Sequence, residues 1–334
     1  MNLMLDLPVK KLPETISYEQ GLLLIGSCFT EHIGDALEEL KFNVLHNPNG
    51  IIYDPVSICK NLVSYIQQTT YTETDIFERN GLWQSWNHHS RFSGSDKQQV
   101  LDKINLSQKQ AHEFLQEADW LILSFGTSYS YRLLNQETKE LIHPVANCHK
   151  APAEWFKKQM LTINEMVTAI DNCMHQLFHF NPKLKILFTV SPVRHIKDGI
   201  VENNLSKSRL IETIHHMVNK FENLYYFPAY ELVIDVLRDY RFFKEDLVHP
   251  NKQAAQIVFD YFVQASMDDK TIDLQKQVKS IMQAVSHRPF HPASASHQQF
   301  LNSFLESTKK LQAQNPFLDL SKELNYFSGN SEIL

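Results

Sequence analysis

The chain has 334 residues, of which 43% are hydrophobic and 21% are charged, a composition typical of a globular protein with a full-sized core. Its formal net charge is −6 and it contains no block of Lys and Arg residues, which argues against nucleic acid as a partner. The N-terminus lacks the pattern of a signal peptide, and no run reaches the roughly 20 apolar residues of a membrane span, so we expect a cytoplasmic protein.

The strands and helices that the sequence predicts alternate along the chain. Short apolar runs bounded by turn residues predict buried strands at 21–26, 41–48, 118–126, 183–193 and 224–232. Apolar residues at helical spacing predict a helix that carries Ile33, Leu37 and Leu40, and further helices at 55–68, 163–180, 204–221 and 251–266. This alternation predicts an α/β fold in which helices cover both faces of a mostly parallel, five-stranded sheet.

Two segments fall outside this alternation. Residues 70–100 are rich in aromatic residues and histidine without a clear period, and we expect an irregular insertion there that covers the pocket. Residues 267–334 lack a strand pattern, and they predict a helical C-terminal extension that packs on a first domain of residues 1–266.

Metal and disulfide chemistry find little support in the sequence. The four cysteines are widely separated and form no C-x-x-C motif, which suits a reducing compartment. His175 and His179 have the i, i+4 spacing that zinc sites use, but no third ligand accompanies them. We therefore expect no metal and no cofactor.

Ligands of parallel α/β sheets bind outside the carboxyl ends of the strands, so the side chains at those ends are candidate site residues. They are rich in hydroxyls, amides and small residues, and they comprise Ser27 and Cys28, residues 47–50, 126–129 and 191–195, and Tyr230 with Glu231. Ser27 follows the first strand directly, and it is either a turn residue or a nucleophile. The neighbouring thiol of Cys28 fits a small buried residue better than a nucleophile.

A base for Ser27 is found after the last strand. Asp246 and His249 are three residues apart, so the carboxylate can accept the Nδ1 proton of the imidazole and leave Nε2 facing outward. A serine hydroxyl is a weak nucleophile and needs such a base. The pair precedes the last helix on the carboxyl side of the sheet, where Ser27 also lies, so we expect the two halves to converge.

Five stretches of the sequence resemble the GSCFA family: GSCF at 26–29, NPNGIIYDP at 47–55, FGTSYSYRL at 125–133, VANCHKAP at 145–152 and SPVRH at 191–195. This family looks like a branch of the SGNH (GDSL-like) hydrolase superfamily, which implies a flavodoxin-like, three-layer α/β/α fold. The resemblance also implies that Ser27 is the nucleophile, that Asp246 and His249 complete a triad, and that the Gly50 N–H contributes to an oxyanion hole.

The third donor of that oxyanion hole departs from the superfamily pattern. Superfamily members typically have Gly-x-Asn-Asp where this chain has Gly126-Thr127-Ser128-Tyr129. We expect the Asn147 amide to replace the missing donor, because an amide keeps its N–H direction once its other end is held. The hydroxyls of Thr127 and Ser128 are the alternatives.

Further residues at the strand ends have two interpretations. Asn49 and Gly50 either serve the site or only build a turn. Arg194 either binds an anionic group of the substrate or forms a structural ion pair, and His195 lies beside it at the end of the fourth strand.

The sequence thus predicts an enzyme that hydrolyses a carboxylic ester through an acyl-serine intermediate. Trp83 and Trp86 in the insertion could stack on a sugar, which favours an O-acyl carbohydrate over other small-molecule esters. Two alternatives stay open: transfer of the acyl group to another alcohol by the same residues, and a non-catalytic binding module on the same fold.

Overall fold

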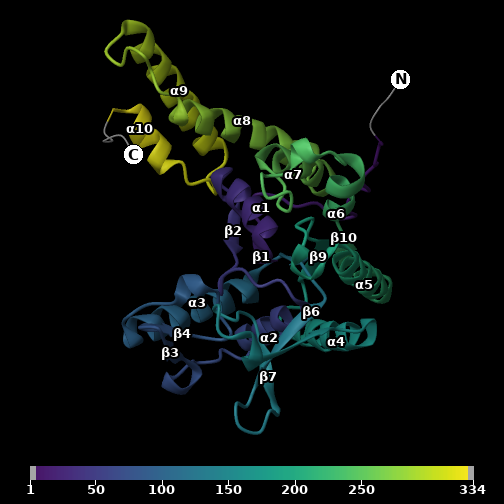
Figure 1. Ribbon diagram of the computed structural model, residues 1–334. Coiled ribbons are helices and arrows are strands. Elements are labelled where there is room, and N and C mark those ends of the chain that lie inside the picture. Colours follow the sequence, from purple (N-terminus) through teal and green to yellow (C-terminus); the bar gives the residue numbers. More distant parts are fainter. Residues whose placement is uncertain (1–4, 330–334) are drawn as a thin grey trace.

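A five-stranded parallel sheet forms the centre of the computed structural model, which describes residues 5–329 (Figure 1). Its strands are β1 (Gly21–Gly26), β2 (Asn43–His46), β5 (Trp120–Phe125), β9 (Lys185–Val190) and β10 (Leu224–Tyr226). They lie in the order β2-β1-β5-β9-β10. This is the doubly wound order of flavodoxin-like folds, in which the chain reverses direction across the sheet beside the first strand. The predicted fold class is confirmed.

Alternate side chains of each buried strand enter two different cores, which makes the fold three-layered. Leu22 and Leu24 of β1 pack with α1 (Cys28–Glu39) and α7 (Lys252–Ser266). Leu23 and Ile25 pack with α2 (Pro55–Ile66), α4 (Ile163–Phe180) and α5 (Ile200–Lys220) on the opposite face. Figure 1 shows α1 and α7 on one side of the sheet and α2 and α4 on the other. Because both faces are covered, the strands read as continuous apolar runs.

Polar side chains begin the helices that carry the candidate site. Asp54 accepts a hydrogen bond from the Ser57 N–H and Pro55 occupies the first turn of α2, as is usual for a helix start. Asn251 caps α7 in the same way, through the Ala254 N–H. These caps determine where each loop at the carboxyl edge of the sheet ends.

The fifth strand is shorter than the sequence predicted. β10 ends at Tyr226, and Pro228, which has no backbone N–H, interrupts the ladder. Tyr230 and Glu231, which we expected at a strand end, belong to the helical turn α6 (Ala229–Glu231) that leads into a π-helical turn over Leu232–Val236.

The insertion at 70–100 is ordered, and this corrects the expectation of an irregular segment. A hairpin joins β3 (Phe77–Arg79) and β4 (Leu82–Gln84), and Asn80 and Gly81 have the positive φ values of its turn. The long helix α3 (Lys97–Glu117) starts inside the insertion. Its apolar side chains close a small third core with the hairpin segment, formed by Tyr71, Ile76, Phe92, Val100, Leu101 and Ile104.

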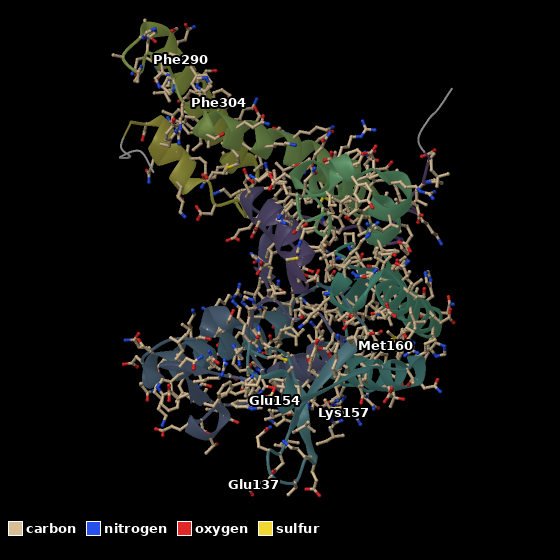
Figure 2. The ribbon with its side chains drawn as sticks, in the orientation of Figure 1. Glu137, Glu154, Lys157, Met160, Phe290 and Phe304 are labelled. Atoms are coloured by element: carbon tan, nitrogen blue, oxygen red, sulfur yellow. The ribbon has the colours of Figure 1, made fainter. Side chains whose placement is uncertain are left out.

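A second sheet, which the sequence analysis did not predict, follows β5. It is antiparallel and consists of β6 (Tyr129–Leu134), β7 (Leu141–Val145) and β8 (Phe156–Met160) in the order β7-β6-β8. Its β6–β7 hairpin points away from the central sheet, and Glu137 lies near the tip (Figure 2).

The C-terminal region is helical, as predicted. Its helices are α8 (Asp269–Ser286), α9 (Ala295–Gln314) and α10 (Ser321–Phe327). Leu311, Leu320 and Phe327 join the core of α1 and α7, and Lys41 forms a 2.7 Å ion pair with the buried Glu323. Phe290, between α8 and α9, lies at the far end of the hairpin that these helices form (Figure 2). Among the described residues, no helix has the combination of length and apolar character that a bilayer crossing requires.

Candidate active site

Ser27 occupies the corner between β1 and α1, where it caps the helix. Its Oγ accepts a hydrogen bond from the Phe29 N–H at 3.3 Å, and its carbonyl accepts one from the Thr30 N–H at 2.9 Å. A Cβ atom on Gly26 would lie 2.4 Å from the Ser124 carbonyl oxygen, so only glycine allows β1 to approach β5 this closely before the corner. The positive end of the α1 dipole therefore meets the Ser27 side chain, and it favours negative charge that develops there.

Asp246 and His249 are joined by a direct hydrogen bond. His249 Nδ1 lies 2.8 Å from Asp246 Oδ2, and the other carboxylate oxygen accepts the N–H groups of Val248 and His249 at 2.9 Å each. These backbone hydrogen bonds, followed by the bond from the imidazole, lower the pKa of Asp246 to about 2. Because the partner of Nδ1 is a carboxylate, Nδ1 carries the ring proton and Nε2 is left as the basic nitrogen.

The loop that carries this pair is attached to the carboxyl edge of the sheet. The Val248 carbonyl accepts the Arg194 N–H at 3.3 Å, which connects the loop to the end of β9. No hydrogen bond joins Ser27 Oγ to His249 in this structure. Catalytic hydrogen bonds often form only when substrate is bound.

The turn at 47–50 is braced from both sides. Asn47 Oδ1 accepts the Gly26 N–H at 2.8 Å, which fixes the start of the Ser27 corner. The Gly50 N–H donates to the Asn47 carbonyl at 2.7 Å, so in this structure it is already engaged. The buried Asn49 donates its amide to Asn61 on α2. That Gly50 and Asn49 contribute to an oxyanion hole therefore stays a prediction. Such a role would require the turn at 47–50 to rearrange.

The insertion supplies the outer brace of that turn. The His89 N–H donates to the Asn49 carbonyl at 2.9 Å, and the Arg91 guanidinium donates to the Asn47 carbonyl. Gly50 has a φ of 81°, and a Cβ there would lie 2.2 Å from His89 Cβ. The insertion thus acts on the site through the backbone of the turn.

The three expected third donors also have partners. Thr127 Oγ1 and Ser128 Oγ each lie 3.0 Å from the Ser206 hydroxyl on α5. Asn147 Oδ1 accepts the His149 N–H at 2.8 Å, which holds its own loop and leaves the amide nitrogen as the available donor. The structure therefore places Thr127 and Ser128 between β5 and α5, and Asn147 in the loop after β7.

Arg194 and His195 lie in different environments. The Arg194 guanidinium is positioned 4.9 Å above the ring of Phe243, next to the Asp246 loop. The His195 ring lies 5.3 Å from that of Tyr53, and burial, followed by Lys207 and His249, lowers the pKa of His195 to about 4. His195 is consequently neutral at physiological pH. Cys28 is half-buried and not fully buried as expected, and this partial burial raises the pKa of its thiol.

Lys207 on α5 is a residue that the sequence analysis missed. It is only 1% exposed, and its Nζ donates to the carbonyl oxygens of Gly126 and Ser191 at 2.6 Å each. A signal was present: Lys207, Leu210 and Ile214 have helical spacing, so a charged residue falls on the apolar face of the predicted helix.

Trp83 and Trp86 have their ring faces against neighbouring side chains. The Trp86 ring stacks on Phe77 at 3.8 Å, and Lys97 Nζ lies 5.0 Å from the centre of the Trp83 ring. These contacts build the insertion, and the expectation that the two rings stack on a sugar gains no support from them.

One group of side chains has the composition of a metal site. Asp35 and Glu38 on α1 and His46 at the end of β2 place one ligand atom each within 4.8 Å of one another. His46 Nε2 lies 3.3 Å from Glu38 and 3.5 Å from Asp35, and both carboxylates are exposed. A surface hydrogen bond between His46 and Glu38 accounts for this arrangement.

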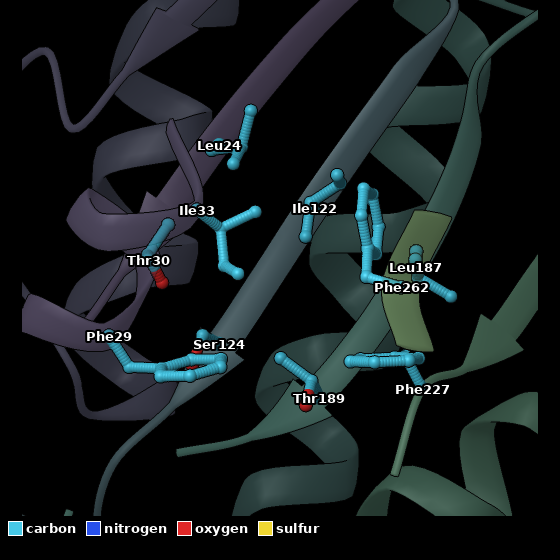
Figure 3. Close-up of a pocket in the computed structure, with 10 residues that line it drawn as sticks. All are labelled: Leu24, Phe29, Thr30, Ile33, Ile122, Ser124, Leu187, Thr189, Phe227 and Phe262. Carbon is cyan, nitrogen blue, oxygen red and sulfur yellow. The ribbon is translucent and has the colours of Figure 1, made fainter. Parts of the chain in front are cut away.

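A cavity of about 20 Å³ lies between the first turns of α1 and the strands β1, β5 and β9 (Figure 3). Apolar side chains from the sheet, α1 and α7 form most of its wall. Thr30, Ser124 and Thr189 also border it, and their buried hydroxyls have no hydrogen-bond partner. The surface that faces the cavity is nearly all apolar, and a cavity without polar partners is expected to stay dry.

Two family models match this chain. A family model described as the GSCFA family matches residues 21–262, and one described as the GSCFA domain protein C-terminal domain matches residues 278–329. No curated protein matches the sequence. The structure of a carbohydrate esterase family 3 from Talaromyces cellulolyticus is 8% identical, with a TM-score of 0.37, and the alignment covers 77% of this chain and 98% of that one.

An acetyl xylan esterase from the rumen bacterium Butyrivibrio proteoclasticus is 11% identical, with a TM-score of 0.33 and coverage of 75% of this chain and 64% of that one. The family match at 21–262 spans well over half of the chain and includes Ser27, Asp246 and His249. The chain belongs to the GSCFA family.

Proposed function

We propose that this protein hydrolyses a carboxylic ester through an acyl-serine intermediate at Ser27, as an SGNH-type esterase. The observation that carries the proposal is the 2.8 Å hydrogen bond from His249 Nδ1 to Asp246, on the same edge of the sheet as Ser27. It presents Nε2 as a base, and the Ser27 hydroxyl lies where the α1 dipole favours an anion.

The reaction proceeds in two halves with the same three residues. Ser27 Oγ attacks the ester carbonyl carbon while His249 Nε2 accepts the hydroxyl proton, and the tetrahedral intermediate then expels the alcohol, which takes that proton. A water molecule attacks the acyl-serine with His249 again as the base, and the carboxylic acid leaves. Asp246 stabilises the imidazolium that forms in each half.

The oxyanion needs fixed donors, and we propose three: the Ser27 N–H, the Gly50 N–H once its turn rearranges, and the Asn147 amide. The Ser27 N–H lies at the N-terminal end of α1, where backbone N–H groups converge on the corner. The Asn147 amide nitrogen is the side-chain donor that we place third, since its oxygen is already held by the His149 N–H. In this arrangement Asn147→Ala lowers kcat with little change in KM.

An O-acyl carbohydrate is the substrate class to test first within this proposal, followed by other small-molecule esters. A sugar ring would bind outside the insertion core, because Phe77 covers a face of Trp86. Acyl transfer uses the same residues and differs only in the acceptor, so a product that depends on an added alcohol would reassign the enzyme as a transferase.

Ester hydrolysis by four purified proteins tests the proposal. Wild type, Ser27→Ala, Ser27→Gly and Cys28→Ala are compared on p-nitrophenyl acetate and on acetylated sugars. Glycine keeps most of the helix-capping preference that alanine loses, so the glycine variant removes the nucleophile with little loss of stability. We expect both Ser27 variants to be inactive and Cys28→Ala to be active. A folded Ser27→Gly variant with full activity excludes the mechanism, and inactivity of the wild type on all esters favours a binding module.

A further inference from the structure

Lys207 is a buried cation without an anionic partner. Its two hydrogen bonds, both 2.6 Å long, go to carbonyl oxygens that directly follow β5 and β9. No carboxylate of the described residues lies within salt-bridge distance of its ammonium group, whereas a charge at this depth is usually paired. Burying such a group is costly, so its position needs an explanation.

The groups that face Lys207 come from three other elements, and none of them carries a negative charge at neutral pH. They are the Cys28 thiol on α1, the His195 imidazole after β9 and the Tyr230 ring of α6, whose centre lies 5.9 Å from Nζ. Burial raises the pKa values of the thiol and of the Tyr230 phenol, which keeps both neutral. Protonated Lys207 therefore has no counter-charge among these groups, and it binds the Gly126 carbonyl oxygen just beyond β5, the strand that pairs with β1 beside the Ser27 corner.

We propose that Lys207 is a positioning residue of the active site, whose ammonium group holds the ends of β5 and β9 together and favours the oxyanion that forms when Ser27 attacks an ester. This inference rests on the proposed function. An anion that exists only in the transition state is stabilised by a fixed positive charge in a region of low dielectric, and the free enzyme gains nothing from it. The charge thus acts on kcat more than on KM.

A pH dependence follows from the same placement. Burial lowers the pKa of Lys207 to about 7, so the ammonium group loses its proton as the pH rises through that value. The rate should therefore fall on the alkaline side of neutral pH. Arginine stays protonated throughout this range, so Lys207→Arg should remove the alkaline fall, while Lys207→Met removes the charge at every pH.

The experiment measures kcat, KM and the rate of labelling by a serine-reactive phosphonate from pH 5 to pH 10, in wild type and variants. We expect Lys207→Met to lower kcat and the labelling rate by about 10- to 100-fold, with KM nearly unchanged and the alkaline fall abolished. Lys220→Met is the control, because this exposed lysine of the same helix pairs with Asp171 and should behave as wild type.

Three results would overturn the inference. The first is a folded Lys207→Met variant with wild-type kcat, labelling rate and alkaline fall. The second result applies if that variant does not fold: the wild-type rate stays constant or rises from pH 6 to pH 10. The third result is that the phosphonate does not label Ser27 in the wild type, which would also refute the proposed function. If Ser27 is labelled and the Lys207→Met variant is unaffected, only this inference is refuted.

Discussion

Asn47 connects the turn at 47–50 to the Ser27 corner, and its replacement tests how the corner is held. The side chain is fully buried, its Oδ1 accepts the Gly26 N–H at 2.8 Å, and its backbone has a φ of 44°, in the left-handed region. In Asn47→Ala the Gly26 N–H loses its partner, which costs about 1–3 kcal/mol. Alanine in the left-handed region costs about 1–2 kcal/mol more.

One term acts in the opposite direction. Asn47 Nδ2 is buried without a hydrogen-bond partner, so its removal recovers about 1 kcal/mol. We therefore expect Asn47→Ala to lower the free energy of unfolding by about 1–4 kcal/mol. Asn47→Gly should be less destabilising, because glycine adopts the left-handed conformation without strain.

Urea denaturation followed by tryptophan fluorescence measures these differences. Asn80→Ala is the matched control, since Asn80 is exposed and has a φ of 54°. Its replacement by alanine loses only the stability that the left-handed backbone conformation costs. Of the three variants, Asn47→Ala should be the least stable. Asn47→Gly should also have a reduced kcat, because the Ser27 corner is no longer anchored. If Asn47→Ala is no less stable than Asn80→Ala, the hydrogen bond to Gly26 does not hold the corner.

Three further changes give separate tests. Asp246→Asn should lower kcat in a folded enzyme, and an unchanged kcat would argue against Asp246 as the partner of His249. Because the pKa of Asp246 is about 2, the wild-type rate should show no titration of Asp246 above pH 4. Burial raises the pKa of Asp54 to about 6, so the stability of the wild type should fall as the pH rises from about 4 to 6. Asp54→Asn keeps the helix cap, so it should remove that fall and be about 1–3 kcal/mol more stable than the wild type at pH 7. Equal pH profiles of stability for the two proteins would refute this. The Thr189 hydroxyl is buried without a partner beside an apolar cavity, so Thr189→Val should raise the free energy of unfolding by about 1 kcal/mol; a loss of stability would indicate that a water molecule binds there.

The central sheet was predictable because its strands are buried on both faces. β1, β5 and β9 are runs of apolar residues that no amphipathic helix contains. β3 and β4 are three residues long, too short for a period to appear, and β8 reads FKKQM because most of it is only half-buried. In α3, Val100, Ile104 and Ala111 have helical spacing, but Gln and Lys residues between them reduce the contrast of the pattern.

In the candidate site, contacts between residues close in sequence were predictable, and contacts between distant residues were not. The Asp246–His249 hydrogen bond joins residues on one turn, so the spacing alone predicts it. The contact of Ser128 with Ser206 and those of Lys207 with Gly126 and Ser191 join residues that only the folded sheet brings together. One sequence carries no signal for such partners.

The acyl-serine intermediate provides the most direct test of the central claim. The enzyme is mixed with p-nitrophenyl acetate, quenched in acid during turnover, digested and analysed by mass spectrometry, with Ser27→Gly as the control. We predict one acetyl group on the peptide that contains Ser27 in the wild type and none in the variant. Acetyl on Cys28, or turnover with no acetylated peptide at all, would contradict Ser27 as the nucleophile.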